Sequence, residues 1–165
     1  MNLLELFAGS RSIGKEAEKQ GLNVFSVDWT DYDKIDLSLD IGELKISDVP
    51  FIPDVIWASP DCKTYSLAAC GHHRNIDRSP KTQYGADCDR VNKHWLNLIK
   101  EWQKINPELI FFIENPRAVF KNMGFMKGIP RTTVTYCSYG VEETAMKPTD
   151  IFSNHCLLYT SDAAD

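Results

Sequence analysis

The side chains best suited to chemistry follow two short apolar runs. Cys62 comes after the run Asp54–Ala58 and the turn-forming residues Ser59-Pro60-Asp61. A cysteine thiolate is a strong nucleophile, so Cys62 is a candidate for covalent catalysis; the alternative is a half-buried structural thiol. The polar pair Glu114-Asn115 follows the second run, Leu109–Ile113, in the same way.

Both runs are predicted to be strands of one parallel sheet. They are short, apolar and bounded by proline or other turn-forming residues, which is typical of buried strands covered on both faces. Ligands and reacting groups collect at the carboxyl ends of strands in open α/β sheets. We therefore expect Cys62 and Glu114-Asn115 to lie at one edge of the sheet.

A glycine-containing turn near the amino terminus is a candidate cofactor site. Asn2–Phe7 is predicted to be the first strand, and Ala8–Gly14 leads into a helix that one of its two serines can cap. Gly9 and Gly14 allow a sharp turn and the close approach of a ligand. Such a turn is common at nucleotide sites, but it also occurs as a simple tight connection.

Two acidic residues further on could complete that site. Val24–Val27 is predicted to be the second strand and ends in Asp28-Trp29, with Asp28 about twenty residues past the glycine turn, where such folds place an acid that meets ribose hydroxyls. The Trp29 ring could lie on a purine. Asp28 could instead simply close a strand into a turn. Ile35–Ile41 predicts a weaker third strand, and Asp40 at its end could accept an adenine amino proton.

The rest of the chain predicts one loop, one helix and one further strand. The polar stretch Gly71–Asp87 is predicted to be a long mobile loop. Arg90–Ile105 predicts a helix, because apolar residues recur every three or four positions, and its tryptophans are expected in the core. A fifth strand is predicted over Thr132–Tyr139, preceded by Arg131, and Lys147–Asp150 predicts a turn. This order predicts a doubly wound α/β domain.

Composition is ordinary for one soluble domain: 165 residues, 43% hydrophobic and 25% charged. No run is long enough to span a membrane and no signal peptide begins the chain, so we expect a cytoplasmic protein without membrane contact. The five cysteines form no CxxC pair, which favours reduced thiols. The cysteines and histidines fit no common zinc spacing, so no metal site is predicted.

The formal net charge of −5 argues against a general nucleic-acid coat, but the charges are unevenly distributed. Residues 16–54 hold ten acidic and three basic side chains, whereas residues 63–100 hold seven basic and three acidic ones. The basic segment behind Cys62 could meet a polyanion. It could equally be a solvated face of the protein.

Four motifs, in their order along the chain, resemble cytosine-5 DNA methyltransferases of the phage-like kind. They are FAGSRSIG at residues 7–14, Asp28-Trp29, SPDCKTYS at residues 59–66 and Glu114-Asn115-Pro116. The most specific parts are Cys62 with a serine four residues later, and Glu-Asn after an apolar strand. The resemblance implies a Rossmann-like, S-adenosylmethionine-dependent methyltransferase fold with a doubly wound, mostly parallel sheet.

The resemblance also implies a cofactor, a substrate and residue roles. It implies S-adenosylmethionine as cofactor and DNA as substrate, although RNA is not excluded. Cys62 would be the nucleophile, Glu114 would engage the base, and a cation such as Arg131 could hold the carbonyl oxygen of the base. The residues implied to contact the cofactor are Phe7, Gly9, Asp28, Trp29, Asp40 and Pro60.

The chemistry explains these residue types. Carbon 5 of cytosine is too weak a nucleophile to take a methyl group directly, and thiolate addition at carbon 6 makes it enamine-like. A carboxyl group that hydrogen-bonds ring nitrogen 3 and the exocyclic amine favours the protonated ring, which accepts the attack of the thiolate. The base must leave the stack, and the basic segment 71–90 is a candidate closing element.

The sequence departs from the family pattern at several positions. Asp61 stands before Cys62 where the family usually has proline, and a carboxylate there repels a thiolate. Glu-Asn-Pro replaces the usual Glu-Asn-Val, and Arg131 stands alone where the pattern has two arginines. We expect residues 1–155 to be a truncated catalytic domain without a target-recognition region. The tail 156–165 matches one reading frame of a sequencing adapter and is set aside.

Two other functions remain open. An amino methyltransferase, acting on N4 of cytosine or N6 of adenine, needs no cysteine and would carry a Pro-Pro-aromatic group where Pro60-Asp61-Cys62 stands. A cofactor-binding or DNA-binding module without turnover is the second. Oligomeric state, recognition sequence and biological role cannot be inferred from the sequence.

Overall fold

The computed structural model describes residues 1–135 and 148–155, and its centre is a seven-stranded sheet. The strands are β1 (Asn2–Leu6), β2 (Asn23–Asp28), β3 (Leu37–Ser38), β4 (Val55–Ala58), β5 (Ile110–Pro116), β6 (Arg131–Thr135) and β7 (Pro148–Ser153). The helices are α1 (Ser12–Lys19), α2 (Cys70–His73) and α3 (Gln83–Ile105).

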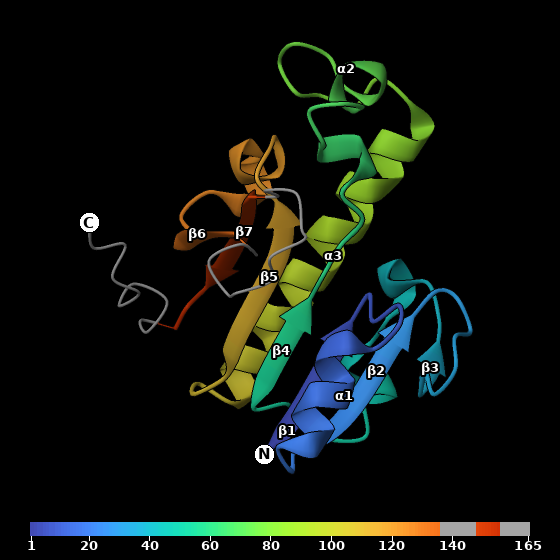
Figure 1. The fold of residues 1–165 in the computed structure, drawn as a ribbon, viewed down its shortest axis with the longest axis vertical. Coiled ribbons are helices and arrows are strands. Elements are labelled where there is room, and N and C mark those ends of the chain that lie inside the picture. The colour runs from blue at the N-terminus through green and yellow to red at the C-terminus, as the bar shows by residue number, and fades with distance from the viewer. Residues whose placement is uncertain (136–147, 156–165) are drawn as a thin grey trace.

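The strand order is β3-β2-β1-β4-β5-β7-β6 (Figure 1). The five strands from β3 to β5 pair in parallel, whereas β7 is antiparallel to both β5 and β6. The prediction of a mostly parallel, doubly wound α/β sheet is confirmed. The parallel arrangement puts the carboxyl ends of β1, β2, β4 and β5 at one edge.

Helices α1 and α3 cover opposite faces of this sheet. In Figure 1, α1 lies in front of β1 and β2, and α3 runs behind β4 and β5. Trp95 and Trp102 of α3 are fully buried in one cluster with Leu4, Ile56 and Ile113 from three strands. Each such side chain contributes about 1.5–3 kcal/mol on burial. The predicted core position of both tryptophans is confirmed.

Helix α1 packs on β1 through a polar contact at a glycine. Glu5 is buried, and its two carboxylate oxygens accept hydrogen bonds from the Gly14 amide (3.0 Å) and the Ser26 hydroxyl (2.8 Å). A Cβ at Gly14 would lie 2.5 Å from Glu5 Oε2, so glycine is what lets the helix approach. The predicted serine cap is wrong. Arg11 precedes the helix with φ +58°, and its side chain makes no capping bond.

The predicted loop over residues 71–87 is partly helical. It contains α2, and α3 begins at Gln83 instead of Arg90. The Thr82 hydroxyl caps α3 by accepting a hydrogen bond from the Gly85 amide at 3.1 Å. The first turns of α3 carry mainly polar or small residues, so apolar periodicity could not reveal them.

Three further predictions need correction or comment. The third strand is shorter than predicted, and Asp40 lies beyond β3. The predicted turn at Lys147–Asp150 is wrong from Pro148 onward, because those residues open β7, where buried Thr149 and Asp150 hide the strand from a hydropathy reading. Of the predicted fifth strand, residues 132–135 lie in β6, which begins one residue earlier at Arg131. The remainder of the prediction, with Cys137 and the tail 156–165, lies outside the described residues.

Within the described part of the chain, none of the helices combines the length and apolar character needed to cross a membrane.

Candidate cofactor pocket and nucleophile turn

A cavity of about 690 Å³ lies at the carboxyl edge of the sheet, beside the amino-terminal half of α3. Four of the six predicted cofactor residues line it, each from a different connection: Phe7 after β1, Trp29 after β2, Asp40 after β3 and Pro60 after β4. Its volume is in the range of small-molecule sites. Topology therefore brings together residues that are far apart in sequence.

The turn after β1 is held in an uncommon backbone conformation. Phe7 has φ +58° and Gly9 has φ +50°, in the left-handed region that non-glycine residues rarely adopt. Such a conformation at Phe7 costs about 1–3 kcal/mol and persists where the surroundings enforce it. The Phe7 ring packs edge-on against Trp95 with ring centroids 6.1 Å apart. Core packing therefore fixes one wall of the cavity.

The structure joins the other two predicted cofactor residues directly. The Gly9 amide donates to Asp28 Oδ2 at 2.9 Å, and the Thr30 amide donates to Asp28 Oδ1 at 2.9 Å. Asp28 is buried, and these two hydrogen bonds connect the glycine turn to the end of β2. Neither Gly9 nor Asp28 lines the cavity itself, although each carboxylate oxygen of Asp28 retains a second lone pair.

Trp29 and Asp40 form the more open side of the cavity. Trp29 is 78% exposed, which is unusual for so large an apolar side chain. Such exposure leaves the face of the ring accessible to a ligand. Asp40 Oδ1 accepts a hydrogen bond from the Gly42 amide at 2.8 Å. Its other oxygen lies 3.6 Å from Arg90 Nη2, so Asp40 is oriented from two sides.

Cys62 opens a turn that borders this cavity. Its side chain is half-buried, and it precedes the short 3-10 helix Lys63–Tyr65. Its carbonyl accepts hydrogen bonds from the amides of Tyr65 (3.0 Å) and Ser66 (2.8 Å). The residues on either side of Cys62, Asp61 and Lys63, both line the cavity. The predicted nucleophile is therefore adjacent to the predicted cofactor site.

Asp61, directly before Cys62, accepts hydrogen bonds from two donors. These donors are the Lys63 amide (2.8 Å) and the Tyr84 hydroxyl. Burial, and then the hydrogen bond to Asp61, raise the pKa of Tyr84, which therefore stays protonated and donates. Because these donors compensate the charge of Asp61, its repulsion of a thiolate at Cys62 is weakened.

Asn115 connects β5 to the same turn. Its side chain is 1% exposed, and its Nδ2 donates to the Pro60 carbonyl at 3.1 Å. Its Oδ1 is buried and has no hydrogen-bond partner among the described residues, which is rare for a buried amide. Glu114 is half-buried and, because strand side chains alternate, belongs to the opposite face of β5.

The structure does not bring Arg131 to Glu114. In the register of the sheet Glu114 is opposite Ile151 and Arg131 is opposite Phe152, so the two side chains belong to opposite faces. Arg131 Nη1 is instead 2.7 Å from Oδ1 of the buried Asp150. This contact gives Arg131 a structural role in joining β6 to β7.

Sequence reasoning missed the contribution of α3 to the cavity. Six residues of this helix line the cavity: Tyr84, Asp87, Cys88, Arg90, Val91 and Asn92. Tyr84 and Asp87 fall in the predicted loop, whereas residues 90–92 fall in the predicted helix. The Thr82–Gly85 cap is the one signal that the helix begins earlier. Burial raises the pKa of Cys88, so this thiol is poorly suited to be a nucleophile.

Within residues 1–135 and 148–155, no group of three or more His, Cys, Asp or Glu side chains is placed to hold a metal ion.

Known proteins are similar to this chain in sequence and in fold. No protein-family model matches the chain. The chain is 31% identical over 149 residues to a protein of Frog virus 3 named probable DNA (cytosine-5)-methyltransferase. The alignment spans 84% of this chain and 64% of the relative, so the chain corresponds to less than two thirds of that protein. The resemblance inferred from the motifs is confirmed.

Two solved structures share the fold. A methyltransferase of Entamoeba histolytica superposes with a TM-score of 0.62 at 16% identity, covering 92% of this chain and 52% of that one. An S-adenosylmethionine-dependent methyltransferase from Agrobacterium tumefaciens gives a TM-score of 0.54 at 13% identity, with 93% and 55% covered. The predicted Rossmann-like methyltransferase fold is confirmed.

Proposed function

We propose that this chain carries the catalytic region of a DNA (cytosine-5)-methyltransferase, which uses S-adenosylmethionine and a covalent bond to Cys62. The observation that carries the proposal is the convergence of Phe7, Trp29, Asp40 and Pro60 on one cavity bordered by the Cys62 turn. The relative from Frog virus 3 supports the same reaction.

The residues of the cavity fit S-adenosylmethionine. Trp29 offers an exposed ring for the adenine, and Asp40 offers an acceptor for its amino protons. Asp28, which is bonded to the glycine turn outside the cavity lining, would accept from the ribose hydroxyls through its remaining lone pairs. Among the charged residues of the lining, the three carboxylates Asp40, Asp61 and Asp87 outnumber the two cations Lys63 and Arg90, which suits a sulfonium. When bound, the cofactor supplies an electrophilic methyl group.

Cys62 and Glu114 would act on the base. The Cys62 thiolate adds to carbon 6 of cytosine while the Glu114 carboxyl group hydrogen-bonds ring nitrogen 3 and the exocyclic amine. Carbon 5 would then be nucleophilic enough to take the methyl group, leaving S-adenosylhomocysteine. A base, for which water can serve, would remove the proton from carbon 5; that electron pair forms the double bond between carbons 5 and 6, and the electrons of the bond between carbon 6 and Sγ return to Cys62 as the thiolate. No step is assigned to Arg131, because its guanidinium is paired with Asp150.

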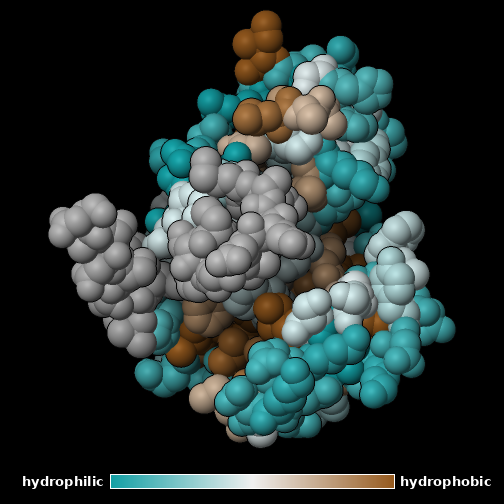
Figure 2. Space-filling view, viewed as in Figure 1, coloured by the Kyte–Doolittle hydropathy of each residue, from teal (hydrophilic) through white to brown (hydrophobic). Residues whose placement is uncertain are grey.

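DNA is the proposed substrate, and the segment around α2 offers contacts for it. Arg78 and Lys81 are exposed cationic side chains beside a second cavity of about 590 Å³. Ile76 and Leu67 are exposed large apolar side chains, and brown atoms protrude at the top of Figure 2, over the α2 region. Cationic side chains hold phosphates, and apolar ones can enter a distorted base step.

The test is to trap the covalent bond between Cys62 and the base. The protein at its full natural length is incubated with S-adenosylmethionine and DNA containing 5-fluorocytosine, which blocks loss of the group at carbon 5. We expect a cofactor-dependent protein–DNA complex that survives denaturation. Cys62→Ala should abolish it, whereas the matched control Cys70→Ala should not.

Three outcomes would overturn the proposal in whole or in part. A trapped complex that survives Cys62→Ala would exclude Cys62 as the nucleophile. Methylated N4 of cytosine or N6 of adenine, formed by wild type and by Cys62→Ala alike, would indicate an amino methyltransferase instead. Methylation of RNA but not of DNA in the same assay would reassign the substrate.

A further inference from the structure

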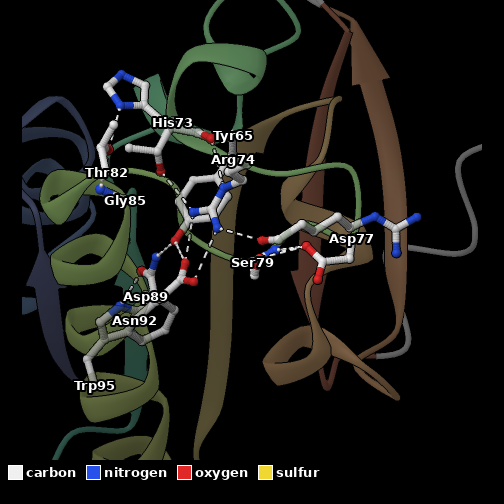
Figure 3. A network of polar contacts seen from close by, with 12 residues as sticks. Tyr65, His73, Arg74, Asp77, Ser79, Thr82, Gly85, Asp89, Asn92 and Trp95 are labelled. Carbon is white, nitrogen blue, oxygen red and sulfur yellow. Dashed lines mark hydrogen bonds and ion pairs between the residues drawn. The ribbon is translucent and has the colours of Figure 1, made fainter.

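A buried ion pair joins the segment after the Cys62 turn to α3 (Figure 3). Arg74 is 5% exposed and Asp89 is 7% exposed. Arg74 Nη2 lies 2.8 Å from Asp89 Oδ1, and Nη1 lies 3.2 Å from Oδ2, so the guanidinium and the carboxylate are joined by two bonds. This geometry is the strongest and most directional form of such a pair.

The same guanidinium holds the turn itself. Arg74 Nε donates to the Thr64 carbonyl at 2.9 Å, and Nη2 donates to the Thr64 hydroxyl at 3.1 Å. Its Nη1 also donates to the Arg78 carbonyl at 3.2 Å. Every N–H group of the guanidinium therefore has an acceptor. Two of these bonds end on a residue only two positions after Cys62.

Tyr65 connects the turn to the other half of the pair. Its hydroxyl donates to Asp89 Oδ1 at 2.7 Å and accepts from Asn92 Nδ2 at 2.7 Å. Its fully buried ring lies under Arg74, with Cζ 4.1 Å from the ring centroid. Burial, and then the bond to Asp89, raise the pKa of Tyr65, so its hydroxyl remains a donor.

The network also extends to the cofactor cavity. Asn92 lines that cavity, and its Oδ1 accepts from Trp95 Nε1 at 2.9 Å. Trp95 in turn packs on Phe7, another residue of the cavity wall. The turn after Cys62 and the cofactor cavity are thus fixed to the same turns of α3.

A buried ion pair is a poor way to gain stability, because desolvating two charges costs about as much as their attraction returns. An apolar pair would fill the same space at lower cost. The ion pair instead fixes the conformation of the turn, because a planar guanidinium whose donors are all satisfied permits only one arrangement of its acceptors. When a reacting atom is misplaced by about 1 Å, the reaction rate can fall on the order of a hundredfold.

We infer that Arg74 and Asp89 are positioning residues that fix the turn Lys63–Tyr65 and thereby place Cys62 Sγ beside the cofactor cavity. This inference rests on the proposed function of Cys62. Neither residue touches the reacting atoms, and both act through Thr64 and Tyr65.

The test uses two conservative variants of the full-length protein. Arg74→Lys keeps the charge but loses the planar fork, and Asp89→Asn keeps the shape but loses the charge. The first readout is hydrogen exchange at the Tyr65 and Ser66 amides, which bond the Cys62 carbonyl. The second is the rate of 5-fluorocytosine trapping at saturating cofactor, with cofactor affinity measured separately.

We expect both variants to exchange these two amides faster and to trap at least about tenfold more slowly, with cofactor affinity changed by less than about twofold. Leu98→Ala is the control, because it removes a buried core side chain of α3 that belongs to none of these bonds. It should lower thermal stability while leaving trapping by folded protein at the wild-type rate.

Trapping at the wild-type rate by folded Arg74→Lys and Asp89→Asn would refute the inference. If Asp89→Asn fails to fold, Tyr65→Phe replaces it, since that variant removes only one hydroxyl from the network; unchanged trapping and exchange in Tyr65→Phe would count equally against it. If wild type traps no DNA through Cys62, the proposed function fails, while exchange at the Tyr65 and Ser66 amides still decides whether Arg74 and Asp89 fix the turn.

Discussion

The side-chain amide of Asn115 donates a hydrogen bond to the main-chain carbonyl of Pro60 over 3.1 Å. This bond joins the end of β5 to the loop that carries Cys62. A counterpart exists elsewhere in the fold, where Asn106 Nδ2 donates to the Pro53 carbonyl, also over 3.1 Å. The two bonds provide a matched pair for separating stability from function.

We expect Asn115→Ala and Asn106→Ala each to lower the free energy of unfolding by about 1–2 kcal/mol, because each removes one hydrogen bond to a carbonyl. Asn106→Ala also removes the bond that Oδ1 accepts from the Glu108 amide at 3.2 Å. Only Asn115→Ala should also slow trapping at Cys62. Urea denaturation measures the first effect and the 5-fluorocytosine assay the second. Equal trapping rates in the two variants would show that Asn115 supports the fold alone.

The contact between Gly14 and Glu5 makes a second prediction. A methyl group at Gly14 would lie 2.5 Å from Glu5 Oε2, so Gly14→Ala must displace α1 or the buried carboxylate. We expect a loss of about 1–3 kcal/mol in the free energy of unfolding. Gly71→Ala is the control, because a Cβ there meets no atom within 4 Å. Equal denaturation midpoints for the two variants would contradict this account.

The sequence was sufficient to predict the parallel sheet and the residues at its carboxyl edge. Strands such as β4 and β5 are apolar and end in turn-forming residues, so both their positions and their polar ends could be inferred. Four predicted cofactor residues accordingly meet at one cavity. Strand-end positions follow from topology, which a strand–helix order largely determines.

What could not be predicted depends on polar tertiary contacts. The start of α3 is specified by the Thr82 cap and by burial of Asp89 against Arg74, neither of which leaves an apolar period. In β7, buried Asp150 is tolerated only because Arg131 and Thr133 bind it. The same pairing separates Arg131 from Glu114, which no reading of one motif could show.

Cys88 makes a third prediction, because it lines the cavity and burial raises the pKa of its thiol. A thiol reacts as the thiolate, so the raised pKa moves the onset of alkylation to higher pH than for an ordinary cysteine. We expect iodoacetamide to label Cys88 slowly at neutral pH and faster as pH rises. Saturating S-adenosylhomocysteine should protect it, whereas Cys70, outside the cavity lining, should be labelled as before.

Peptide mass spectrometry after timed labelling measures both effects. Labelling of Cys88 that the cofactor product leaves unchanged would mean that the cavity is not the cofactor site. The pH series is independent of that result, since it reports the pKa of the thiol in the protein without ligand.

Trp29 makes a fourth prediction. If its exposed ring stacks on the adenine, Trp29→Ala should weaken cofactor binding by about 1–2 kcal/mol, the range for an aromatic ring on a base. The free energy of unfolding should hardly change, because little of the ring is buried. Tyr32→Ala removes another exposed aromatic ring of the same connection and should bind normally. Calorimetric affinities that agree between wild type and Trp29→Ala would remove Trp29 from the site.

The last prediction concerns Glu114, at the carboxyl end of β5. Glu114→Gln keeps the size and most hydrogen-bonding capacity of the side chain but cannot supply an acidic proton to ring nitrogen 3. We expect cofactor affinity to be retained and methylation to fall by at least about a hundredfold, as for loss of an acid–base group. Trapping with 5-fluorocytosine should slow in parallel, because the carboxyl group assists the addition of Cys62 to carbon 6.

The matched control is Glu108→Gln, just before β5 at the opposite end of the strand, where the side chain is exposed. It makes the same chemical change far from the carboxyl edge and should leave both rates unaltered. Loss of folding or of cofactor affinity in Glu114→Gln would make Glu114 a structural carboxylate. Slower methylation with an unchanged trapping rate would instead place its action after the bond to Cys62 has formed, and the role proposed for it in the addition step would be wrong.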